Sequence, residues 1–180
     1  VNASKTIQIN FSKRKDYIPK IPDVETEKHV KFLGIILDGN LGWTEHVDGL
    51  CKKISIGIYA VRRIKWIGNV ENAKTAYYSL VETHMRYGIA VWGGSSVGNL
   101  NKVLVLQKKA IRILADLEPQ QSCRQAFQTL SILTVTALYI QEVILHAHSL
   151  GLQTGKDIHP YNTRHAANYV LPPHRTAIYG

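Results

Sequence analysis

The stretch TEHVDGLCKKISIGIYAVRRIKWIG, residues 44–68, has its apolar residues at the spacing of an α-helix. These positions fall on one stripe, which predicts an amphipathic helix packed on a core. The stripe consists of Val47, Leu50, Cys51, Ile54, Ile58 and Val61. Thr44 is the expected N-cap and Gly68 the expected stop. The remaining faces carry Lys52, Lys53, Arg62, Arg63 and Lys65, against Glu45 and Asp48 early in the stretch.

The helical period continues beyond Gly68. Asn69 is expected to cap a second helix that runs to about Val91, and Asn99 to open a third. A short helix is predicted after Ser122, and Thr134 is expected to cap a last helix that ends near Leu150. The third helix should turn Val103, Leu106, Ala110, Ile113 and Leu114 inward and leave Lys102, Lys108, Lys109 and Arg112 elsewhere.

The first 38 residues have the pattern of strands. Ile7, Ile9 and Phe11 alternate with polar residues, which predicts a strand with one buried face. A second strand is predicted from Val30 to Leu37, before the turn signal Asp38-Gly39-Asn40. An antiparallel pair of strands cannot bury itself, so we expect it to pack on something larger.

These elements predict an α+β fold, with a short N-terminal antiparallel strand pair followed by a mostly helical bundle. After Gly151 the pattern dissolves into a proline-containing stretch, which is interpreted as an irregular, extended tail. The expected divisions are therefore 1–41, 42–151 and 152–180. The chain begins with Val1 and has Met85 as its one methionine, which suggests an internal or truncated piece.

Basic residues outnumber acidic ones, 22 to 13, for a net charge of +9. This excess favours a polyanionic partner, with nucleic acid before an acidic membrane surface or acidic protein. A basic protein that merely stays soluble is the alternative. The first residues lack the long apolar stretch of a signal peptide, and no window of 18 apolar residues occurs, so we expect no membrane partner.

Cysteine and histidine spacing predicts no metal site. Cys51 and Cys123 are not at C-x-x-C spacing, and they are interpreted as buried free thiols in a reducing, intracellular compartment, cytoplasm or nucleus. His146 and His148 are two apart, so on a helix they would point to different sides. Tyr59, Tyr77 and Tyr78 are expected in the core rather than as platforms on which bases stack.

An ordered series of short motifs covers almost the whole chain. It consists of Asn2–Thr6, Lys31–Asp38, Leu41-Gly42-Trp43, Glu45-His46-Val47, Tyr59 with Arg62-Arg63, Tyr87-Gly88, Trp92-Gly93, Leu106–Arg112 and Tyr161–Arg164. In this order the series resembles the C-terminal part of a non-LTR retrotransposon reverse transcriptase of the jockey-like sort.

The resemblance implies the end of a polymerase palm, a thumb and a C-terminal region. Lys5 would match the palm lysine proposed to protonate the pyrophosphate leaving group, or it is a solvated lysine at a strand start. Phe32, Leu33 and Gly34 would lie at the primer terminus, although core packing alone would also explain Phe32 and Leu33. The thumb would grip an RNA–DNA or primer–template duplex beside the upstream palm and fingers. The candidate basic residues are Lys52, Lys53, Arg62, Arg63, Lys65, Lys108, Lys109 and Arg112.

Nucleotide addition needs paired carboxylates that hold two metal ions. No two of the thirteen acidic residues are adjacent, and Asp38 is interpreted as a turn former. We therefore expect no cofactor in this segment, Mg²⁺ in the full-length parent, and no polymerase activity from the segment alone. The alternatives are a non-enzymatic basic binding module derived from a retrotransposon, or a remnant without function.

Overall fold

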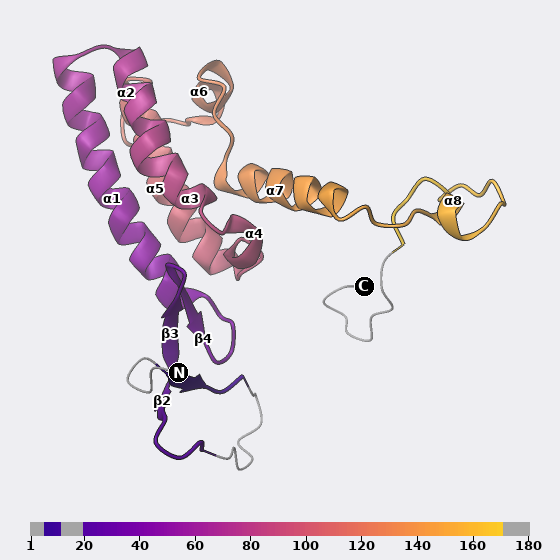
Figure 1. Cartoon of the computed structure of the whole chain (residues 1–180). Helices are drawn as coiled ribbons and strands as arrows, with labels where there is room; N and C mark the ends of the chain where they lie inside the picture. The colour runs from indigo at the N-terminus through magenta and orange to yellow at the C-terminus, as the bar shows by residue number, and fades with distance from the viewer. Residues whose placement is uncertain (1–5, 12–19, 171–180) are drawn as a thin grey trace. The chain divides into compact units, whose positions relative to one another are not determined.

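A computed structural model of the chain describes residues 6–11 and 20–170 (Figure 1). Its internal contacts divide the chain into two compact units, Val1–Ile140 and Gln141–Gly180. The expected α+β class is confirmed, because the strands of the described residues all precede the helices. Lys5 lies outside the described residues.

The strands pair differently from the expectation. β1 (Ile7–Ile9) runs parallel to β2 (Glu25–Glu27). β3 (His29–Phe32) and β4 (Ile35–Asp38) form a separate antiparallel hairpin. The predicted single strand from Val30 to Leu37 is therefore wrong, and so is its pairing with the first strand. Residues 30–37 instead fold back as a hairpin, with the turn between β3 and β4.

The turn between β3 and β4 falls at Leu33 and Gly34, whose φ angles are 45° and 83°. A left-handed backbone is easy for glycine, whereas the Cβ of leucine makes it costly. Only Gly34 signals this turn within an otherwise apolar run. As a result the Leu33 side chain is carried outward and is 74% exposed.

α1 (Thr44–Ile67) packs against both α2 (Val70–Tyr77) and α5 (Val97–Leu114), as Figure 1 shows. The predicted stripe is confirmed, since all its members are buried except Cys51, which is half-buried. Trp43, with φ 64°, occupies the N-cap in place of Thr44. Gly68 ends the helix as expected.

The segment after α1 is not the one continuous helix that its pattern predicts. Asn69 does cap α2, because its side-chain oxygen accepts a hydrogen bond from the Asn72 N–H. The chain then continues through a π-helical turn, η2 (Tyr78–Glu82), and the short helices α3 (Thr83–Arg86) and α4 (Ile89–Trp92). Gly88, at φ 62°, separates the last two.

The π-helical turn lies directly against α1. A Cβ added at Gly57 would overlap the carbonyl oxygen of Leu80 and lie 2.9 Å from its carbonyl carbon. The absence of a side chain at Gly57 therefore lets the two backbones approach. This contact between positions far apart in the sequence accompanies the departure from a regular helix.

Ser96, and not Asn99, caps α5, and α6 (Arg124–Thr129) follows as expected after Ser122. Gln107 of α5 is fully buried and joins three segments. Its amide nitrogen donates to Tyr77 Oη at 2.9 Å and to the Leu133 carbonyl at 2.8 Å. Its amide oxygen accepts from the Val135 N–H at 2.8 Å, at the start of α7 (Val135–Ser149).

The second unit contains more local structure than the expected extended tail. α8 (Gly155–Ile158) begins with a capping box in which Thr154 and Asp157 bond each other reciprocally. An isolated bridge joins Thr154 to Tyr169, and Ala166 is buried within the unit. The described part of the predicted tail is thus a small folded loop with its own hydrogen bonds.

Candidate nucleic-acid interface

The side of α1 turned away from the core carries both basic and apolar residues. We call it the α1 outer face, and its members, all exposed, are Lys52, Lys53, Ile56, Tyr59, Arg62, Arg63 and Trp66. Within the part of the chain that the structure describes, none of its four cations forms an ion pair. None of the four is therefore held at ion-pair distance by a carboxylate of the described residues, so each can act on an external anion.

The aromatic residues of this face are exposed. Tyr59 is 66% and Trp66 77% exposed, and the Arg63 guanidinium lies 5.1 Å from the centroid of the Trp66 ring. The expectation that Tyr59 is a core residue is wrong, and Tyr78 is also partly exposed, whereas Tyr77 is buried as expected. Tyr59 falls on the opposite side of the helix from the buried stripe, which the helical period already implies.

The remaining basic candidates have other surroundings. Lys65 Nζ lies 2.8 Å from Asp116 Oδ2, and Arg112 Nε donates to the Gln121 carbonyl at 3.0 Å. These contacts connect α1 and α5 to the loop after Leu114. Lys109 is exposed on α5, whereas Lys108 is half-buried and lines a cavity of about 490 Å³ with Arg112 and Arg124. The structure thus does not gather all eight cations on one face.

The tip of the β3–β4 hairpin presents the other group of candidates. Phe32 and Leu33 are exposed, so they are not core residues. The Tyr87 hydroxyl donates to the Leu33 carbonyl at 2.6 Å, and the Tyr87 ring lies against Gly34. Tyr87 therefore holds the backbone of the hairpin tip, while the side chains of Phe32 and Leu33 face outward.

Asp38 organises the loop between the hairpin and α1, as its place in a turn signal predicts. Its carboxylate accepts hydrogen bonds from the backbone N–H groups of Asn40, Gly42 and Trp43 at 2.9–3.0 Å. Partial burial acts to raise the pKa of Asp38, but these backbone bonds outweigh it and hold the pKa below the usual 3.8. The loop sets where α1 begins, and hence the position of its outer face.

Asp38→Ala should destabilise the chain by about 1–2 kcal/mol at pH 7, because three N–H groups lose their acceptor. The folded-state pKa lies below the unfolded one, so this stabilisation is present above pH 3.8 and is lost as the pH falls through the folded value. Urea unfolding of both proteins at several pH values should show a difference that shrinks below about pH 4. An equal difference at pH 3 and pH 7 would contradict this.

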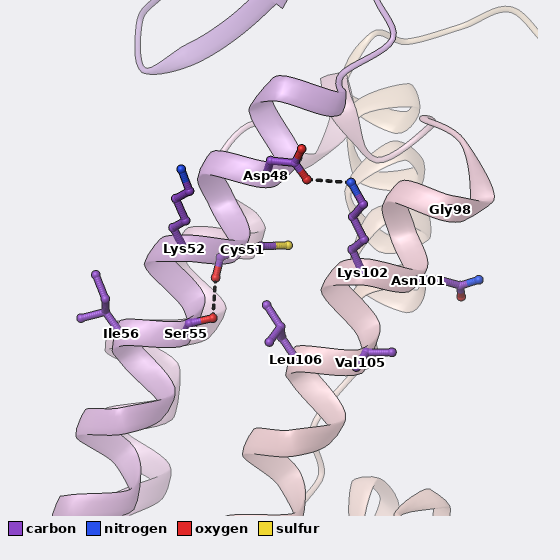
Figure 2. A pocket seen from close by; sticks show the side chains of 10 residues that line it. All are labelled: Asp48, Cys51, Lys52, Ser55, Ile56, Gly98, Asn101, Lys102, Val105 and Leu106. Atoms are coloured by element: carbon purple, nitrogen blue, oxygen red, sulfur yellow. Dashed lines mark hydrogen bonds and ion pairs between the residues drawn. The ribbon is translucent and has the colours of Figure 1, made fainter.

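A shallow groove of about 830 Å³ runs between α1 and α5 (Figure 2). Figure 2 shows Cys51 of α1 and Leu106 of α5 pointing toward the facing helix. Lys102 Nζ and Asp48 Oδ1, 2.7 Å apart, bridge the two helices here. Burial, and then the Asp48 charge, raise the pKa of the Cys51 thiol, so it is a poor nucleophile.

A second cavity, of about 480 Å³, lies between the β3–β4 hairpin, α1 and the η2–α3 region. Lys31, His46 and Lys53 line it, and sequence reasoning identified only Lys53. His46 is named in the motif series, but nothing in the spacing of the sequence indicates that it reaches a cavity. Among residues 6–11 and 20–170, no group of three or more His, Cys, Asp or Glu side chains could hold a metal ion.

Three curated proteins of Drosophila melanogaster are similar to the chain. The probable RNA-directed DNA polymerase from transposon BS is 28% identical over 129 residues, which are 64% of this chain and 14% of that protein. The RNA-directed DNA polymerase from mobile element jockey is 22% identical over 172 residues, 86% of this chain and 18% of that protein. The chain is related to the jockey-like retrotransposon polymerases.

The probable RNA-directed DNA polymerase from transposon X-element is 24% identical over 126 residues, again covering 14% of that protein. This chain therefore spans less than a fifth of the length of the jockey-like relatives that it matches. No family model and no solved structure matches it. In the described residues, no helix has both the length and the apolar character needed to cross a bilayer.

Proposed function

We propose that this chain is a duplex-binding part of a retrotransposon RNA-directed DNA polymerase and works within a longer polypeptide. The similarity to jockey-like polymerases and the net charge of +9 support a nucleic-acid partner. The observation that carries the proposal is the α1 outer face, where four exposed cations have no carboxylate partner in the described residues.

The arrangement suits a sequence-independent grip on a nucleic-acid backbone. Lysine and arginine on one helix face would contact phosphates, while Ile56, Tyr59 and Trp66 would lie against sugars. Phosphate contacts release bound counterions, so the affinity should depend steeply on salt and little on sequence. An RNA–DNA hybrid or primer–template duplex is the partner that the family suggests.

The hairpin tip would lie near the primer terminus in this arrangement. Phe32, Leu33 and Gly34 offer an exposed apolar edge held by Tyr87, which supports contact with a sugar or base rather than with a core. Lys5 stays a proposed proton donor to the leaving pyrophosphate. The upstream palm and fingers would supply the paired carboxylates and bind Mg²⁺.

We expect the 180-residue chain to bind an RNA–DNA hybrid in a salt-dependent way. If the four cations of the α1 outer face each neutralise one phosphate, affinity should fall about a hundredfold between about 50 and 200 mM salt. Filter binding of a labelled hybrid at several salt concentrations measures this slope. Two hybrids of unrelated sequence serve as the control, since a backbone grip should not distinguish them. No binding at low salt would overturn the proposal.

A further inference from the structure

Arg112 of α5 lines two cavities of the first unit. One, of about 540 Å³, lies between the C-terminal ends of α1 and α5 and is also lined by Arg62, Lys65 and Trp66. The other is the cavity of about 490 Å³ beside α6. Because Arg62 and Trp66 belong to the α1 outer face, Arg112 connects that face to the cavity beside α6.

Three cations line the cavity beside α6, and no aspartate or glutamate of the described residues does. Lys108 and Arg112 are half-buried on successive turns of α5, and Arg124 is at the start of α6. Like charges four residues apart on a helix repel each other, and partial burial makes a charge without a partner less favourable. Arg112 Nε donates to the Gln121 carbonyl, but none of the three cations forms an ion pair within the described chain. An anion bound in this cavity would relieve both effects.

The cavity between α1 and α5 adds an aromatic ring to these cations. Trp66 is 77% exposed. Asp116 is the one carboxylate among the described residues that line this cavity, and it is already paired with Lys65. Arg62 and Arg112 form no ion pair within the described residues. An exposed indole beside arginines without carboxylate partners is the combination that binds unpaired bases and their phosphates.

The shape of this path favours a single strand over a duplex. A duplex is stiff over about 150 base pairs and presents its bases only at the groove edges. It can lie along the α1 outer face, but it cannot bend into a cavity of about 490 Å³ beside another helix. A single strand is flexible, and its bases can stack on an aromatic ring while its phosphates contact successive cations. An acidic peptide would match the charge but would leave the Trp66 ring without a planar partner.

We infer that the path from Trp66 over Arg112 to Lys108 and Arg124 binds single-stranded nucleic acid. A base stacks on the Trp66 ring, and successive phosphates contact Arg112, Lys108 and Arg124. The inference deepens the proposed function and rests on it for the origin of the strand, which is the unpaired extension of a duplex held on the α1 outer face. The strand is RNA, as in a template, or DNA, as in a primer, since both offer the same phosphates and stacking bases.

Hybrids with and without a single-stranded extension test this path. The 180-residue chain is titrated with a blunt RNA–DNA hybrid and with the same hybrid carrying an unpaired extension of about eight nucleotides, a usual length for a single-strand site. We expect the extension to raise the affinity about tenfold and to steepen the salt dependence by about 2, the slope for three phosphates of a single strand. Extensions of RNA and of DNA, compared at equal length, assign the strand.

Variants separate the path from general charge effects. Lys108→Gln with Arg124→Gln should weaken binding of the extended hybrid about tenfold and change binding of the blunt hybrid by less than about twofold. Lys20→Gln with Lys74→Gln is the matched control, because it removes the same charge from residues that line neither cavity. Circular dichroism checks that each variant is folded. Should the first pair fail to fold, Arg124→Gln alone gives the test, since Arg124 is exposed.

Trp66 supplies a spectroscopic signature of stacking. Of the three tryptophans, Trp92 is buried and Trp43 is half-buried, so Trp66 is the one open to a base. An unpaired oligonucleotide should quench tryptophan fluorescence in the parent chain but not in Trp66→Phe, which keeps an aromatic ring. Trp66→Ala should lose about tenfold in affinity for the strand. Poly-glutamate of equal charge should bind more weakly than the oligonucleotide, because it has no ring to stack.

The outcomes distinguish the single-strand path from the proposed function. If the blunt hybrid binds with the expected salt dependence and the extension adds no affinity, the path is wrong and the duplex grip stands. If the unpaired oligonucleotide binds with quenching and is sensitive to Lys108→Gln with Arg124→Gln, while the blunt hybrid does not bind at low salt, the path stands and the proposed function fails. Equal losses in the two double variants, or equal binding of poly-glutamate, would overturn the path.

Discussion

Exchanging Lys52 and Arg63 together for glutamate is expected to weaken binding of an RNA–DNA hybrid about a hundredfold at low salt. Both residues are exposed on the α1 outer face and form no ion pair among the described residues. The double change removes two phosphate contacts and adds two repelled charges, so the salt slope should also fall by about 2. Filter binding across a salt series gives both quantities.

A matched control separates this local effect from the change in net charge. Lys20→Glu with Lys74→Glu alters the net charge by the same amount at residues outside the α1 outer face. The control should lower affinity several-fold less than Lys52→Glu with Arg63→Glu. Far-ultraviolet circular dichroism should be unchanged in both, since none of the four side chains is in the core. A loss of helical signal in the first variant would show that its positions are structural.

Gly57→Ala is expected to destabilise the first unit by about 2–3 kcal/mol, the size of overpacking in a closely packed core. Alanine is intrinsically better than glycine in a helix by about 1 kcal/mol, which acts in the opposite direction. The clash decides the sign, because a Cβ at Gly57 would overlap the Leu80 carbonyl oxygen and meet Val81 Cγ2 at 3.1 Å. Backbone atoms of a neighbouring helix cannot move away as a flexible side chain can.

Gly49→Ala supplies the control on the same helix. A Cβ at Gly49 would have its nearest neighbour, Ile36 Cδ1, at 3.8 Å, which is ordinary contact. This substitution should therefore stabilise the chain by up to about 1 kcal/mol through helix propensity. Urea unfolding of the two variants beside the parent chain measures both changes. Equal effects at the two positions would show that the approach of η2 to α1 is not as close as described.

Patterns within one element were good guides to this fold. The apolar period of residues 44–68 identified the buried stripe of α1, and Asn69, Thr134 and Gly68 were correctly placed at helix ends. Such signals succeed because the N-cap bond and the amphipathic stripe depend on residues within one or two turns. The same period places Tyr59 on the outer side of α1, away from the stripe, in agreement with its exposure in the structure.

Errors arose where the backbone departs from the regular form of its element. A left-handed residue at Leu33 converted one predicted strand into the β3–β4 hairpin, and the π-helical turn at Tyr78–Glu82 and the break at Gly88 divided one predicted helix. Neither Leu33 nor the residues of η2 favour these conformations by themselves. Contacts with residues far away in the sequence accompany the hairpin turn and the π-helical turn. The Tyr87 hydroxyl donates to the Leu33 carbonyl, and the lack of a side chain at Gly57 lets the Leu80 backbone lie close to α1.

The sequence by itself determined the helical stripe, the excess of positive charge and the ordered motifs that relate the chain to jockey-like polymerases. Only the tertiary structure decided which cations are free of carboxylate partners: Lys52 and Arg63 face outward, whereas Lys65 is paired with Asp116, 51 residues away. It also decided that His46, Lys31 and Lys53 line one cavity. The physical reason is that charge pairing and cavities depend on distances between segments, and local periodicity contains no information about those distances.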